Sequence, residues 1–92
     1  MTPAERPNAI RTRLEQALAP CEVDVQDASA RHAGHVGARD GRGHFSVTVV
    51  SPAFDGQDRI TRHRAVYGAL SDLMDTDIHA LSIRALTPKE KP

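Results

Sequence analysis

The strongest constraint on the fold is a change of hydrophobic period in the second half of the chain. Between residues 58 and 74, large side chains return every three or four positions, which is the period of an amphipathic helix. These positions are Ile60, His63, Val66, Tyr67, Leu70, Leu73 and Met74. From residue 78 to 86 the period becomes two, and His79, Leu81, Ile83 and Ala85 share one side. The sequence therefore predicts a helix capped by Asp58, followed by a strand whose core side includes His79.

The first half of the chain predicts one more helix and two more strands. Asn8 is a candidate N-cap, and the helix after it ends before Pro20. Its apolar positions are Ile10, Leu14, Ala17 and Leu18. Alternating apolar residues then predict strands on either side of a glycine-rich segment, residues 29–43, that has no periodicity. The simplest pairing of two strands joined in this way is antiparallel.

Together these elements predict an α+β domain, with helices on one face of a small three-stranded sheet. We expect this domain to span residues 8–88. Residues 1–7 are expected to form a flexible lead-in and residues 89–92 a flexible tail.

Composition limits the function. The 12 basic and 12 acidic residues leave no net charge, which argues against broad phosphate neutralisation but allows a local basic patch. The single cysteine, Cys21, excludes an internal disulfide, and its core-side parity after Pro20 indicates a structural role. Neither a signal peptide nor a long apolar run is visible, so a cytoplasmic protein without membrane contact is expected. No catalytic motif is present, and we expect no enzymatic activity.

Several short motifs, in this order and spacing, resemble the BolA family from about residue 10 to residue 88. They are Val25-Gln26-Asp27-Ala28-Ser29, His44-Phe45, Val49-Val50-Ser51, Phe54-x-Gly56, Arg62-His63-Arg64-x-Val66-Tyr67 and His79-Ala80-Leu81. The resemblance implies an αββαβ arrangement similar to type II K-homology domains. The chain departs from the family at Ala28 and Ala30, where many relatives carry Glu and His.

The resemblance also implies a function. BolA-like proteins are non-enzymatic partners of a monothiol glutaredoxin, with which they share a [2Fe–2S] cluster in iron–sulfur assembly, trafficking or iron sensing. The glutaredoxin supplies its cysteine and a glutathione thiol, and the BolA-like protein supplies a histidine at a strand start and a second ligand from the loop. By this resemblance the metal ligands are His79 and one of His32 and His35, of which we favour His32. Two imidazoles can replace two thiolates on one iron, as in Rieske centres. The isolated chain is expected to carry no cofactor.

Each histidine also has a simpler explanation. His79 would be a satisfied core residue and His32 and His35 solvated polar groups, while His44 is expected to be a surface neighbour of the loop. Structural roles are predicted for His63, Tyr67, Phe54 and Gly56.

The alternative function is a DNA-binding transcriptional regulator that uses a helix carrying Arg59, Arg62 and Arg64. Against it, the Gly-x-x-Gly clamp of K-homology domains is absent before that helix, and Asp55 and Asp58 would repel phosphate. The same arginines suit a protein interface equally well. A third explanation is an adaptor without metal. The sequence also leaves open whether the free protein forms a homodimer.

Overall fold

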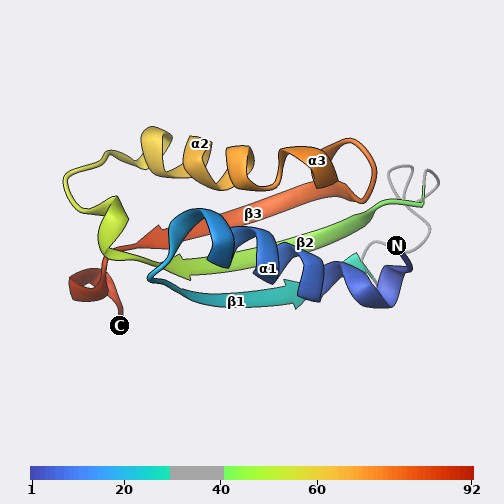
Figure 1. Ribbon diagram of the computed structural model, residues 1–92, viewed down its shortest axis with the longest axis horizontal. Helices are drawn as coiled ribbons and strands as arrows, with labels where there is room; N and C mark the ends of the chain where they lie inside the picture. The colour runs from blue at the N-terminus through green and yellow to red at the C-terminus, as the bar shows by residue number, and fades with distance from the viewer. Residues whose placement is uncertain (30–40) are drawn as a thin grey trace.

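The computed structural model describes residues 1–29 and 41–92 (Figure 1). Its helices are α1 (Arg6–Leu18), α2 (Arg59–Ala69) and α3 (Ser71–Met74), and its strands are β1 (Glu22–Asp27), β2 (Gly43–Val50) and β3 (Ile78–Leu86). Helices α1 and α2 lie side by side on one face of the sheet (Figure 1). The predicted α+β class is therefore confirmed, and the order of elements is compatible with a K-homology-like arrangement.

The sheet has the order β1-β2-β3, so β1 and β3 are its edges in the described part of the chain. Strands β1 and β2 pair antiparallel, as predicted, while β3 runs parallel to β2. The β2–β3 pairing is irregular at its start, because Gly43 lies opposite Ile78 whereas His44 lies opposite Ala80. His79 is thus the additional residue of a β-bulge.

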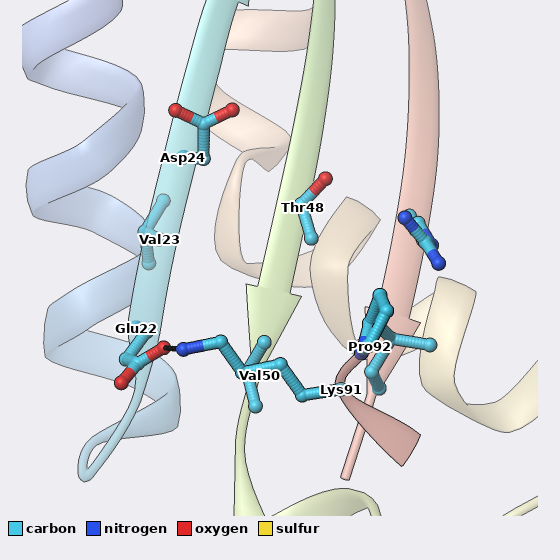
Figure 2. Close-up of a pocket in the computed structure, with 9 residues that line it drawn as sticks. Glu22, Val23, Asp24, Thr48, Val50, Lys91 and Pro92 are labelled. Atoms are coloured by element: carbon cyan, nitrogen blue, oxygen red, sulfur yellow. Dashed lines mark hydrogen bonds and ion pairs between the residues drawn. The ribbon is translucent and has the colours of Figure 1, made fainter. Parts of the chain in front are cut away.

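The hydrophobic core fills the space between the helices and the sheet. Its fully buried members include Ile10, Leu14, Val47, Val49, Phe54, Val66, Leu70 and Ile78. No helix of the described residues covers the opposite face of the sheet (Figure 1). On that face the side chain of Lys91 reaches past Val50 and forms a 2.6 Å ion pair with Glu22 (Figure 2). This pair, together with a 3-10 turn over Pro88–Glu90, holds the residues that were predicted to form a flexible tail.

The start of the first helix differs from the prediction. Helix α1 begins at Arg6, directly after a 3-10 turn over Pro3–Glu5, and Asn8 lies inside the helix instead of capping it. Proline is well tolerated in the first helical turn, where its missing N–H would have no partner in any case. Pro7 therefore occupies the first turn of α1, within the stretch predicted to be a flexible lead-in.

The second helix is capped as predicted but is shorter and rotated. Asp58 Oδ1 accepts a hydrogen bond from the Thr61 N–H at 2.8 Å. Hydrogen bonds from the Thr61 side chain and from this N–H lower the pKa of Asp58. The predicted single helix is divided at Leu70 into α2 and α3. Ile60 and Tyr67, which were expected on the core side, are 62% and 42% exposed. Both lie about 100–120° around the helix axis from Val66, the buried centre of α2.

Candidate functional site

His79 lies at the start of β3 and is exposed, which corrects the prediction that it faces the core. The cause is the bulge, because an extra residue shifts the alternation of side chains by one position. Ile78 takes the buried position and is 1% exposed, while Leu81, Ile83 and Ala85 pack against the core as predicted. The bulge therefore presents an imidazole to solvent at one end of the sheet.

A second histidine lies beside it. The ring of His44, the second residue of β2, is half-buried, and its centroid is 5.2 Å from that of His79 with the ring planes inclined by 47°. We call His44 and His79 the histidine pair. His44 was expected to be a surface neighbour of the loop, whereas the structure places it in direct ring contact with the predicted ligand.

Arg42 restricts the chemistry of the pair. Its Nη2 lies 3.3 Å from His79 Nδ1. A guanidinium only donates hydrogen bonds, so Nδ1 must accept and the neutral ring carries its proton on Nε2. A metal ion could bind Nδ1 only if Arg42 moved away. It could bind Nε2 only after the proton had moved to Nδ1, which also breaks the Arg42 contact. Metal ligation by His79 and this hydrogen bond therefore exclude each other.

The last described residue before residues 30–40 is anchored next to the histidine pair. Ser29 Oγ accepts a hydrogen bond from the His44 N–H at 3.1 Å, and Ala28 N–H donates to His44 O at 2.8 Å. Gly43 packs so closely here that an added Cβ would lie 2.7 Å from Ser29 Oγ. These contacts bring Ser29 to the start of β2.

The chain that follows residue 40 is anchored at the same place. Arg6 donates from Nη2 to Gly41 O at 2.8 Å and forms a 2.8 Å ion pair with Asp77 through Nε. Both side chains of this pair are 13% exposed, and the hydrogen bonds from Arg6 and Thr76 lower the pKa of Asp77. Gly43 N–H also donates to Asp77 O at 2.9 Å. Both ends of the segment that carries His32 and His35 are thus fixed beside the histidine pair.

The two predicted loop ligands, His32 and His35, lie outside the described residues. Within residues 1–29 and 41–92, no group of three or more His, Cys, Asp or Glu side chains is arranged to hold a metal ion. A metal bound to His79 would therefore need ligands from residues 30–40 or from another molecule.

The three arginines of the predicted partner surface fall into two kinds. Arg59 and Arg64 are exposed on α2, whereas the Arg62 side chain is 13% exposed and directed into the fold. Arg62 donates to Gln57 O at 2.9 Å and to Ala85 O at 3.2 Å, and it forms a 2.6 Å ion pair with Glu90. Arg62, together with the Thr87 N–H, lowers the pKa of Glu90 to about 2. Arg62 thus maintains the fold, a role that its position in the sequence gave no sign of.

The residues predicted to be structural are distributed differently. Phe54 is 1% exposed in the core, and Gly56 has a φ of +76°, a conformation that side-chain-bearing residues rarely adopt. His63 is half-buried on α2, and Tyr67 is mainly exposed. Cys21 is half-buried, and burial, followed by the charge of Glu15, raises the pKa of its thiol. A thiol in this state is a poor nucleophile, which agrees with the structural role predicted for it.

The comparison with known families shows to which family the chain belongs. The model of the BolA family, described as BolA-like protein, matches residues 14–90. The chain belongs to the BolA family. Among solved structures, the BolA domain of SufE1 from Arabidopsis thaliana superposes with a TM-score of 0.80 at 43% identity, covering 94% of this chain and 95% of that one. BolA1 from Mus musculus superposes with a TM-score of 0.73 at 42% identity, covering 90% and 65% of the two chains.

Two curated relatives are much longer than this BolA-like chain. The chloroplastic protein BOLA1 of A. thaliana is 42% identical over 90 residues, which are 95% of this chain and 56% of the relative. The SufE-like protein 1 of the same plant, named as chloroplastic and mitochondrial, is 45% identical over 86 residues, 88% of this chain and 23% of the relative. In the described residues, no helix is long and apolar enough to span a membrane. A cytoplasmic location stays a prediction.

Proposed function

We propose that this BolA-like protein is a non-enzymatic partner of a monothiol glutaredoxin, with which it holds a [2Fe–2S] cluster through His79. The observation that carries the proposal is the bulge at the start of β3, which exposes His79 beside both fixed ends of the histidine-bearing segment. Membership of the BolA family supports the proposal. A BolA domain inside a SufE-like protein supports a role in iron–sulfur processes more generally.

The donor set fits a shared cluster better than a site built by one chain. His79 supplies one exposed imidazole, and His32 or His35 would supply the second, because the residues on both sides of the segment that carries them are anchored beside His79. The glutaredoxin cysteine and a glutathione thiol would complete the coordination, as the family resemblance implies. When bound, the cluster supplies electron transfer or iron–sulfur units for delivery. The protein residues hold it, and Arg42 competes with it for His79.

The direct test is co-expression with a monothiol glutaredoxin, followed by iron and sulfide analysis and visible circular dichroism of the purified complex. We expect a cluster in the wild-type complex and an altered or lost visible spectrum for His79→Ala. His63→Ala is the matched control, because His63 lies on α2 and outside the histidine pair. Unchanged far-ultraviolet spectra should show that both variants fold. A His79→Ala complex with an unaltered visible spectrum would remove His79 from the ligands.

A second test uses the competition between Arg42 and the cluster. Replacing Arg42 by Ala removes the hydrogen bond to His79 Nδ1, so ligation would no longer require that bond to break. We expect the Arg42→Ala complex to lose its cluster to a chelator more slowly than wild type. Faster loss would mean that Arg42 supports the bound state, and the competition would have to be abandoned.

A further inference from the structure

Along the free edge of β3, at the end of the strand far from His79, lies a groove that the proposed function does not use. It is a hollow of about 480 Å³ between the first turns of α2 and the last residues of β3. Its walls are formed by Gln57, Arg59, Arg62, His63, Ile83, Arg84, Ala85, Leu86 and Glu90. Strand residues rise about 3.3 Å each, so Ala85 lies about 20 Å along β3 from His79. The groove is therefore separate from the histidine pair.

The backbone at this edge is open to pairing. Leu86 O accepts a hydrogen bond from Ser51 N–H at 2.9 Å, so the backbone N–H and C=O of Leu86 point toward β2. Because backbone groups alternate along a strand, those of Ala85, Ile83 and Leu81 point toward the free edge. The Arg62 side chain donates a hydrogen bond to Ala85 O at 3.2 Å, which agrees with this direction. Leu81 and Ile83 thus offer an incoming strand the groups that an edge strand normally exposes.

The groove carries an excess of positive charge. Arg59 and Arg84 are both exposed, and within the described ranges neither forms an ion pair. The one carboxylate of the wall, Glu90, is already engaged by Arg62 at 2.6 Å. The neighbouring Asp58 accepts from the N–H of Thr61 at the start of α2. An acidic ligand would therefore find two unneutralised guanidinium groups.

Two further features favour a peptide. Gln57 Oε1 is buried in the described structure without a hydrogen-bond donor, and an amide N–H could supply one whereas a carboxylate or phosphate could not. Ile60 and Tyr67, three positions before and four after His63, expose 62% and 42% of their surface on the same side of α2. Such apolar surface beside a free strand edge is typical of strand-addition sites.

We propose that an extended, acidic segment of a partner protein docks in this groove and adds to β3 as a further strand. Its backbone pairs with Ile83 and Leu81, and its carboxylates contact Arg59 and Arg84. Because Arg62 already donates to Ala85 O, this oxygen is not available to the added strand. This function would be additional to cluster ligation at the opposite end of the sheet.

The test uses synthetic peptides of about ten residues in which pairs of Glu alternate with Val, because successive side chains of a strand point to opposite faces and Arg59 and Arg84 lie on opposite faces of β3. A Lys–Val peptide of the same pattern is the charge control. Binding is measured by fluorescence anisotropy, and contacts by amide chemical shifts of the ¹⁵N-labelled full chain. The variant Arg59→Glu with Arg84→Glu reverses the charge of the groove. Arg64→Glu, an exposed change on the same helix outside the groove, is the matched control. A peptide with a central proline removes one donor from the added strand.

We expect the acidic peptide to bind, to shift the Ile83 and Leu81 amides and to protect them from solvent exchange. The double variant should weaken binding at least tenfold and Arg64→Glu less than twofold, and the central proline should abolish it. Several results would overturn the proposal: equal binding of the Lys–Val peptide, binding without change at Ile83, or no binding of the acidic peptide. Preferential binding of a single-stranded oligonucleotide that depends on Arg59 and Arg84 would instead assign the groove to nucleic acid. A homodimer paired through β3, seen by light scattering with no peptide binding, would assign it to a second copy.

Discussion

Gly43 offers a sharp test of how the start of β2 is packed. A Cβ at this position would lie 2.7 Å from Phe45 Cε2 and 2.7 Å from Ser29 Oγ. Phe45 is only 2% exposed and has little room to move away. Gly43 is not among the residues with a positive φ, so the expected cost is steric and not conformational. Overpacking of a filled core typically costs about 1–3 kcal/mol, and we expect Gly43→Ala to lower the free energy of unfolding by this amount.

Gly68 provides the matched control. It lies in α2, and a Cβ there would meet nothing within 4 Å. Gly68→Ala should therefore stabilise the protein by up to about 1 kcal/mol through helix propensity alone. Urea unfolding followed by circular dichroism measures both changes, and each kcal/mol should move the melting temperature by about 4–8 °C in a domain of this size. If Gly43→Ala unfolds within 0.5 kcal/mol of wild type, on the order of the error of such measurements, the packing argument fails.

Three more predictions concern the rest of the fold. Ser51 is fully buried, and its Oγ donates to Leu18 O at 3.1 Å and accepts from Ala53 N–H at 3.1 Å. Ser51→Ala should therefore lower the free energy of unfolding in urea by about 1–3 kcal/mol. The same change at the exposed Ser82 should be nearly neutral. The pKa of Glu90 is about 2, below its ordinary value of 4.5, so its ion pair with Arg62 stabilises the fold above pH 4.5 and this contribution is lost as the pH falls toward 2. Glu90→Gln should reduce the dependence of the free energy of unfolding on pH between pH 4.5 and 2. An unchanged pH dependence would refute the contribution assigned to the ion pair between Glu90 and Arg62. Because the pKa of Cys21 is raised, its alkylation by iodoacetamide near neutral pH should be slower than that of a free thiol, and an equal rate would contradict its burial.

Local signals were sufficient for the class of the fold. The period of the helix around Val66, the cap at Asp58 and the alternation in β2 depend on neighbouring residues, and the structure contains each of them. These signals also indicated that the sheet would carry its helices on one face. The direction of β3 relative to β2 was not encoded in any local pattern.

The site depended on contacts that are distant in the sequence. Strand parity alone placed His79 toward the core, and only the register with β2 reveals the bulge that turns it outward. Arg62 resembles a surface charge until the fold brings Glu90, 28 positions later, against it. The contact between Arg42 and His79 spans 37 positions and likewise left no signal. The family resemblance proposed His79 as a ligand, but the pairing register explains how that residue becomes accessible.

The parallel pairing of β2 with β3 has a consequence for biosynthesis. β2 is the central strand of the finished sheet, yet its partner on one side is β3, which follows later in the chain, after α2 and α3. While residues 78–86 are still inside the ribosome, the nascent chain presents one side of Gly43–Val50 as an unpaired apolar edge. Such edges favour association between chains. Emergence of residues 78–86 from the ribosome therefore completes the sheet and ends the period in which a newly made molecule is most exposed to misassembly.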